Sequence, residues 1–149
     1  SDLQVLVLRG ANVTHFGHYP EKLQISASVG AKTGEKYIAA GSFDVVVEAT
    51  GRKYGLLQAV DMTRPRGTIV LKSTVNDLVA LASDKVVVNE LSIVGSRCGR
   101  FEPALKLLRS GKLQLDAMIS DRFPLFMAPQ AFAAAEKKGT LKVLLYGQS

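Results

Sequence analysis

Phe43-Asp-Val-Val-Val-Glu-Ala-Thr-Gly51 is the stretch that decides the fold of this chain. Its apolar run stops abruptly in small residues, and a second run of the same kind follows it, Gly67-Thr-Ile-Val-Leu-Lys-Ser73. Between the two runs, Lys53–Met62 places apolar residues at helical spacing and is closed by Thr63-Arg-Pro65. Two strands joined through a helix predict a β-α-β unit, in which the strands lie parallel.

The ends of these two strands are the first candidate site. The run Val45-Val46-Val47 predicts a strand that is buried on both faces, as in a parallel sheet covered by helices. Such sheets bind ligands beyond the carboxyl ends of their strands. Small or polar residues stand at those ends: Thr50, Gly51, Lys72 and Ser73.

The composition limits the class of protein. The 149 residues suit one domain, or one domain and part of another, and 47% apolar residues allow a substantial core. There is no run of about eighteen apolar residues and no signal-peptide pattern, so we expect a cytoplasmic protein without a membrane partner. The net charge of +6 comes from scattered Lys and Arg without a basic stripe or stacking aromatics, which argues against a nucleic-acid partner.

Metal-ligating residues are scarce. The only cysteine is Cys98, and the two histidines, His15 and His18, lie close together near the start of the chain. One cysteine excludes an internal disulfide framework, and no spacing is that of a zinc site. We therefore predict that this chain alone builds no metal site.

Strand and helix patterns also precede the central unit. Val13–Phe16 predicts a strand, and Glu21–Val29 predicts a helix with Gly30 just past its end. Residues 31–42 read as a connection with a short strand around Tyr37-Ile38. Leu3–Leu8 has two interpretations, a strand by propensity or a helix that ends at Arg9-Gly10, and we favour the helix.

The patterns after the central unit predict a further strand and helix. The β-rich run Lys85–Val88 leads to a strand at Leu91–Val94, which ends at Gly95-Ser-Arg-Cys-Gly99. Phe101–Leu108 is an amphipathic helix that Gly111 stops.

The last thirty residues differ in character. An alanine-rich helix over Pro129–Lys138 is stopped by Gly139, and the apolar run Leu141–Tyr146 predicts a final strand. This strand has no obvious partner in the repeating strand-helix part of the chain.

Together these segments resemble the medium-chain dehydrogenase/reductase superfamily, which includes zinc alcohol, sorbitol, threonine and glucose dehydrogenases. The resemblance runs from about Ala11 to Leu145. Its segments, in the family's order, are Phe43–Gly51, Leu56–Val60, Arg64–Val70, Asn89–Ser96, Gly111-Lys112, Ile119–Leu125 and Ala131–Leu145.

The resemblance implies an α/β fold with a Rossmann-like, doubly wound parallel sheet. Members of the superfamily begin with a GroES-like catalytic domain, and a GxGxxG turn after the first Rossmann strand binds the pyrophosphate. This chain carries neither. We therefore expect residues 1–118 to form a partial NAD(P)-binding domain that lacks its first strand and glycine loop. Residues 119–149 would be the C-terminal helix and strand of the catalytic domain.

Ten residues would contact the cofactor by this resemblance. The end of the second Rossmann strand discriminates NAD from NADP, and Gly17 and His18 stand there without an acidic residue, with Lys22 one helical turn on. This favours NADP over NAD, although His18 and Lys22 would also suit an exposed turn. The remaining candidates follow the later strands: Ala49, Thr50, Gly51, Lys72, Ser73, Ser96 and Arg97.

The resemblance also implies a function. We expect a fragment of an NAD(P)-dependent, alcohol dehydrogenase-like oxidoreductase that acts on a small alcohol or polyol or its carbonyl product. None of the candidates is a catalytic residue, and zinc and the proton relay would belong to the missing domain, so the chain alone should be inactive. The alternative is a non-catalytic nucleotide-binding or dimerisation module, with a homodimer formed through the strand at Leu91–Val94.

Overall fold

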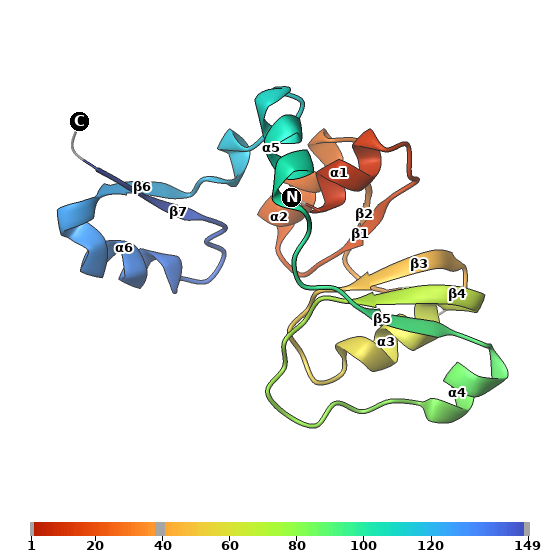
Figure 1. The fold of residues 1–149 in the computed structure, drawn as a ribbon. Coiled ribbons are helices and arrows are strands. Elements are labelled where there is room, and N and C mark those ends of the chain that lie inside the picture. The colour runs from red at the N-terminus through yellow and green to blue at the C-terminus, as the bar shows by residue number, and fades with distance from the viewer. Residues whose placement is uncertain (1, 38–40, 148–149) are drawn as a thin grey trace. The chain divides into compact units, whose positions relative to one another are not determined.

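The structure, a computed structural model, describes residues 2–37 and 41–147 (Figure 1). Two compact units divide the chain: one is Tyr37–Gly99, and the other combines Ser1–Lys36 with Arg100–Ser149. Within the described residues, every helix is too short or too polar to cross a membrane.

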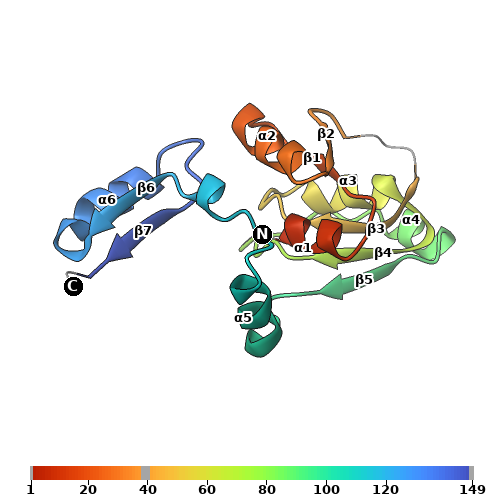
Figure 2. The same cartoon turned by 90° about the horizontal axis from the view of Figure 1, so that it is seen from above.

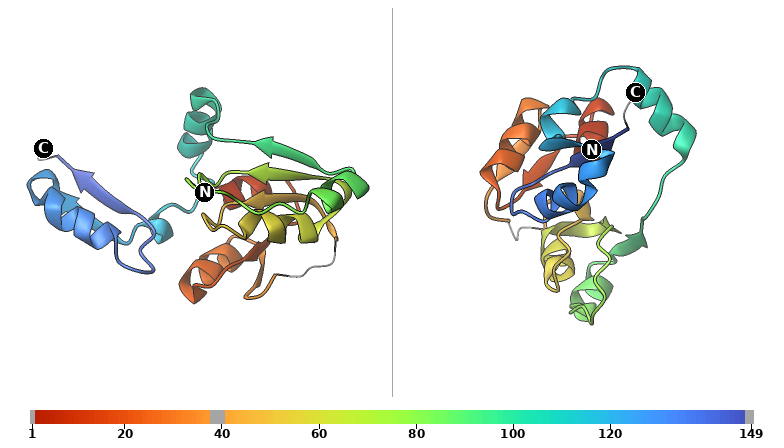
Figure 3. Two further views of the ribbon diagram at one scale, coloured as in Figure 1. Left: turned by 90° about the horizontal axis from the view of Figure 1, so that it is seen from below. Right: turned by 90° about the vertical axis from the view of Figure 1, so that its left-hand side faces the viewer.

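The unit Tyr37–Gly99 contains the predicted β-α-β arrangement and extends it by one strand (Figures 1 and 3). Its elements are β3 (Phe43–Glu48), α3 (Gly55–Met62), β4 (Thr63–Leu71), α4 (Ser83–Val88) and β5 (Ser92–Gly95). The three strands are parallel and lie in the order β3-β4-β5. The parallel β-α-β unit predicted from the sequence is therefore confirmed.

The core of this unit lies between α3 and the sheet. Ile69 on the central strand is fully buried, and it is paired with Val46 on β3 and Ile93 on β5. From α3, Ala59 and Val60 are each only 2% exposed. An apolar helix face that meets the middle of a parallel sheet excludes water from both, which stabilises the unit.

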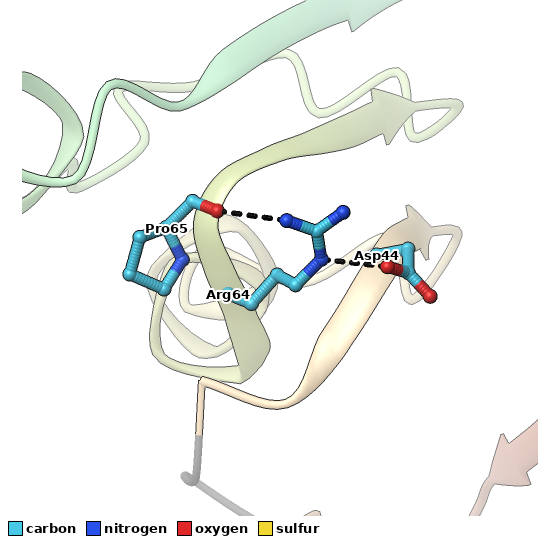
Figure 4. Close-up of polar contacts among 3 residues, drawn as sticks. All are labelled: Asp44, Arg64 and Pro65. Carbon is cyan, nitrogen blue, oxygen red and sulfur yellow. Dashed lines mark hydrogen bonds and ion pairs between the residues drawn. The ribbon is translucent and has the colours of Figure 1, made fainter.

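The beginning of β4 corrects one expectation. The second strand was predicted over Gly67–Ser73, but β4 already begins at Thr63, which pairs with Phe43. Thr63 is also the C-cap of α3, so the helix is closed where the sequence predicted. The register then shifts, so that Val45 pairs with Thr68. Arg64 bridges the irregular stretch: its Nε donates to Asp44 Oδ1 at 2.6 Å and a terminal nitrogen donates to the Pro65 carbonyl at 3.2 Å (Figure 4).

A second correction concerns the valine run of β3. Val46 is 9% exposed, whereas Val45 is 55% and Val47 39% exposed, so the prediction of burial on both faces was wrong. Side chains alternate along a strand, and α3 packs on the face that carries Val46. Val45 and Val47 lie on the opposite face, which α3 does not reach.

A third correction concerns Lys85–Val88, which is not a β-rich approach but part of the helix α4. The amide of Asn89 donates to the Lys85 carbonyl at 3.0 Å, and the amide of Leu91 to the Val86 carbonyl at 3.0 Å. Lys85 Nζ also contacts Asp61 Oδ1 of α3 at 2.5 Å. These contacts override the modest strand preference of valine. The predicted strand follows one residue late, at Ser92–Gly95.

The other unit begins with a second parallel strand-helix-strand arrangement (Figure 2). It contains α1 (Asp2–Leu8), β1 (Thr14–Phe16), α2 (Pro20–Ser28) and β2 (Lys32–Gly34). Residues 3–8 are therefore helical, as favoured, and β1 and α2 match their predictions. The short strand of the connection lies at β2 and not at Tyr37, which belongs to no strand. Ile38, the other residue of that prediction, lies outside the described residues.

The C-terminal part of this unit forms a third such arrangement. The final strand pairs in parallel with a short strand before the alanine-rich helix, and that helix packs on both strands. Helix and strand are thus confirmed, although the helix ends earlier than predicted. The elements are α5 (Phe101–Arg109), η1 (Asp116–Met118), β6 (Asp121–Pro124), η2 (Leu125–Met127), α6 (Ala128–Ala135) and β7 (Val143–Tyr146).

Candidate functional site

The carboxyl edge of the sheet β3-β4-β5 gathers most of the predicted site residues. Because the strands are parallel, the residues that follow them emerge at the same edge. Backbone bonds tie neighbouring ends together: the Lys72 amide donates to the Glu48 carbonyl at 2.9 Å, and the Ser96 amide to the Leu71 carbonyl at 3.0 Å. The residues brought together here are Ala49, Thr50, Gly51, Lys72, Ser73, Ser96 and Arg97.

A side-chain bond connects the first two strand ends directly. The amide of Gly51 donates to Ser73 Oγ at 2.8 Å. Ser73 therefore acts as an acceptor towards the protein, and its own hydroxyl hydrogen can be donated to a ligand. This bond brings the two predicted candidates Gly51 and Ser73 into one local structure.

Glu48, the last residue of β3, is a site residue that the sequence prediction missed. It is only 3% exposed, and its Oε1 accepts the Thr50 amide at 2.8 Å and the Thr50 hydroxyl at 2.5 Å. Thr50 Oγ1 in turn accepts the Arg52 amide at 3.2 Å. The Thr50 hydroxyl thus bonds within its own loop. An acidic residue two positions after the buried Val46 was the signal for an inward-facing carboxylate.

Two glycines shape this loop. Gly51 has φ +66°, and no heavy atom lies within 4 Å of the place where a Cβ would be, so the backbone is open to a close approach. Gly55, the first residue of α3, is in the opposite situation. A Cβ there would overlap Glu48 Oε1 and Thr50 Oγ1, so only glycine lets the helix begin beside this pair.

The predicted residues Gly17, His18 and Lys22 form a group of their own in the other unit. Gly17 directly follows β1, and Lys22 lies in the first turns of α2 with its Nζ 4.8 Å from the centre of the Tyr19 ring. That distance suits a cation–π contact. A Cβ at Gly17 would lie 3.3 Å from Leu23 Cδ2, which leaves little room for a side chain at this position.

His15 lies beside this group and was not among the predicted site residues. Its Nδ1 is 2.7 Å from Ser26 Oγ, and the Ser26 hydroxyl donates to the Lys22 carbonyl at 3.0 Å. Since Ser26 has a single hydroxyl hydrogen, Nδ1 is the donor in the first contact. Burial, and then the charge of Lys22, lower the pKa of His15. The neutral ring therefore carries its lone pair on Nε2.

Metal ligands do not gather in the part of the chain that the structure describes. No group of three His, Cys, Asp or Glu side chains among residues 2–37 and 41–147 could hold a metal ion. Cys98 is exposed on the loop after β5. We assign no step to a metal held by these residues.

Sequence comparison shows which known proteins this chain resembles. The family model for zinc-binding dehydrogenases matches residues 3–110. Sorbitol dehydrogenase of Bombyx mori is 30% identical over 110 residues, which are 71% of this chain and 31% of that protein. Sorbitol dehydrogenase of Mus musculus is 29% identical over 104 residues. These residues are 68% of this chain and 29% of the mouse protein. The chain thus spans about a third of the length of these relatives.

Solved structures of similar fold are also dehydrogenases. A zinc-binding dehydrogenase from Sinorhizobium meliloti, solved with NADP, has a TM-score of 0.86 and 26% identity, covering 96% of this chain and 47% of that one. L-Idonate 5-dehydrogenase from Escherichia coli has a TM-score of 0.88 at 21% identity, covering 97% and 46%. These likenesses confirm the α/β fold with parallel, Rossmann-like sheets. The chain belongs to the zinc-binding dehydrogenase family, within the medium-chain dehydrogenase/reductase superfamily that its sequence resembles.

Proposed function

We propose that this chain is the cofactor-binding part of a cytoplasmic NAD(P)-dependent oxidoreductase, which transfers a hydride between a nicotinamide cofactor and a small alcohol or polyol or its carbonyl product. The carboxyl edge of the sheet β3-β4-β5 is the observation that carries the proposal. Family membership supports it, as do the names of the relatives, sorbitol dehydrogenases, and the NADP bound to one solved neighbour.

The residues at this edge fit a nicotinamide nucleotide. Gly51 leaves its backbone open, the Ser73 hydroxyl has a hydrogen to donate, and the exposed guanidinium of Arg97 suits a phosphate or a substrate carboxylate. Ala49, Thr50, Lys72 and Ser96 complete the proposed contact set. When bound, the cofactor would supply the hydride. The residues of this chain would bind and orient it.

The group at the end of β1 is our candidate for the adenosine end of the cofactor. Gly17 replaces the acidic residue that would accept a ribose hydroxyl, and Lys22 supplies a positive charge one helical turn on. These two features, with His18 between them, support NADP over NAD.

Hydride transfer also requires groups that this edge does not contain. A substrate pocket, a proton relay and any zinc ion would come from a GroES-like catalytic domain, and we propose that residues 119–149 are the end of that domain, with residues 1–118 as the nucleotide-binding part. The 149-residue chain by itself is then expected to bind cofactor without turnover.

Cofactor titration tests the proposal. Protein fluorescence is followed while NADH or NADPH is added to the full-length protein that contains this chain. We expect Ser73→Ala and Arg97→Ala to weaken the binding of both cofactors. Lys22→Ala should weaken the binding of NADPH about tenfold more than that of NADH, as for the loss of one charge-assisted contact. Binding of neither cofactor by the unmodified protein would overturn the proposal. If Lys22→Ala lost the same factor of affinity for NADH as for NADPH, only the preference for NADP would be overturned.

The edge strand β5 supports a further part of the proposal, a homodimer. Within the sheet of residues 43–95, β5 has a partner only on its β4 side, and such an edge can pair with a second copy. Val94 on this strand is 51% exposed. Val94→Lys should convert a dimer to a monomer in size-exclusion chromatography, and an unchanged elution volume would exclude pairing through this edge.

A further inference from the structure

The burial of Glu48 calls for a physical reason. A carboxylate that is removed from water is stable only when hydrogen bonds replace its hydration. Here the two hydrogen bonds to Oε1, at 2.8 Å from the Thr50 amide and 2.5 Å from its hydroxyl, both come from a residue two positions on. The carboxylate therefore holds the chain segment that directly follows it, rather than a distant element.

The same segment is held at three more points. Thr50 Oγ1 accepts the Arg52 amide, Ser73 Oγ accepts the Gly51 amide, and the Glu48 carbonyl accepts the Lys72 amide. The three successive amides of Thr50, Gly51 and Arg52 thus each donate to a side-chain oxygen. We call residues 48–52 with these bonds the Glu48 clamp.

Packing holds the clamp from the other side. Gly55 begins α3 so close to Glu48 and Thr50 that an added Cβ would overlap both. The buried carboxylate of Glu48 and the hydroxyl of the exposed Thr50 therefore lie directly against the start of the helix. Gly51, in contrast, faces open space. The clamp thus fixes a backbone position of the loop that a ligand can approach closely.

We propose that Glu48 is a positioning residue of the carboxyl-edge site: acting through Thr50, it holds the Gly51 backbone in the conformation that receives the cofactor. This inference rests on the proposed function, because it assigns the clamp a role in cofactor binding. Glu48 itself need not touch the cofactor. A carboxylate that served packing alone would be replaceable by an apolar side chain of similar size.

Four variants separate positioning from packing, all made in the full-length protein. Glu48→Leu and Thr50→Val roughly keep the size of the side chain and remove the hydrogen bond between the Thr50 hydroxyl and the Glu48 carboxylate. Glu48→Gln and Thr50→Ser keep an acceptor and a hydroxyl, respectively. The matched control is Thr63→Val. It removes a buried hydroxyl that donates to the Ala59 carbonyl at 2.6 Å, at the amino end of β4 and so at the opposite end of the strand from the candidate site.

The readouts are the dissociation constants of NADH and NADPH, the melting temperature, and hydrogen exchange of the Gly51 and Arg52 amides without cofactor. We expect Glu48→Leu and Thr50→Val to weaken cofactor binding about tenfold and to speed exchange at both amides by a similar factor, as for the loss of one strong hydrogen bond. Glu48→Gln and Thr50→Ser should restore most of the affinity. Thr63→Val should lower the melting temperature and leave affinity unchanged.

The outcomes distinguish this inference from the proposed function. If the unmodified protein binds neither cofactor, the proposed function fails and the role in cofactor binding fails with it, while the exchange rates still show whether the clamp orders the loop. If the unmodified protein binds cofactor but Glu48→Leu and Thr50→Val bind it equally well, only the positioning role is overturned. An equal loss of affinity in Thr63→Val would also overturn it, since the effect would then be global. Should Glu48→Leu fail to fold, Thr50→Val decides through hydrogen exchange of the Gly51 amide, because Thr50 itself belongs to the proposed contact set: unchanged exchange there would overturn the positioning role.

Discussion

Gly55→Ala is the substitution whose consequence follows most directly from the structure. The new Cβ would lie 2.9 Å from Glu48 Cδ and closer still to Glu48 Oε1 and Thr50 Oγ1. Real Cβ atoms do not approach other heavy atoms this closely, so something must move. Glu48 and Gly55 are both buried and have little free space to move into, and the exposed Thr50 can move away only by giving up its bond to Glu48.

The expected loss of stability is the balance of two opposing effects. Alanine is favoured over glycine in a helix by up to about 1 kcal/mol. Against this, an extra methyl group in a packed site costs about 1–3 kcal/mol, and turning Thr50 away instead would forfeit a hydrogen bond to a charged group, about 1.5–3 kcal/mol. We therefore expect Gly55→Ala to lower the free energy of unfolding by about 0.5–2 kcal/mol, whereas helix propensity alone predicts an increase.

Urea unfolding followed by circular dichroism measures this difference. The matched control is Gly99→Ala, because no heavy atom lies within 4 Å of a Cβ at Gly99, and its effect should stay within about 0.5 kcal/mol. Adding Thr50→Ala should cost less in the Gly55→Ala background than alone, since the clash has already disturbed that hydroxyl. A Gly55→Ala protein that is as stable as the control would refute the close packing of α3 against Glu48.

Three further outcomes are expected. The lowered pKa of His15 means that the unfolded chain binds the proton more readily, so stability should fall as the pH drops below the ordinary value of 6.5. His15→Asn, which keeps a donor for Ser26, should show a smaller fall when urea midpoints at pH 7.5 and pH 5 are compared. Ile69→Ala should lower the free energy of unfolding by about 2–5 kcal/mol in the same assay, because Ile69 is fully buried. Asp61→Asn should lower the pKa of Lys85 towards its ordinary value, measured by NMR titration, since the bond to Asp61 is the main cause that raises it; an unchanged pKa would contradict that contact.

Local pattern was sufficient for the central unit of this protein. The apolar run of residues 43–48, the helical spacing of residues 55–62 and the run that ends at Leu71 each carry their own signal, because strand and helix periodicities are properties of neighbouring residues. Parallel pairing then follows from the length of the connection. Four candidate residues at the carboxyl edge needed no more than this local pattern: Thr50, Gly51, Lys72 and Ser73.

What depended on distant neighbours was decided by the tertiary structure. Lys85–Val88 became a helix through its own turn bonds and the contact with Asp61, against the strand preference of valine. Val45 is exposed while Val46 is buried, because α3 lies on only one face of β3. β7 found its partner in β6, a strand too short to stand out as periodic.

The same division holds for the candidate site. The sequence by itself determined the fold class, the resemblance that the family comparison confirmed, and the residues that end each strand. Only the tertiary structure decided how those residues are held, because hydrogen bonding and burial depend on atoms that meet through folding. Glu48 shows the difference: along the sequence it is one acidic residue after three valines, and in the folded chain it is the carboxylate that anchors Thr50 beside Gly51.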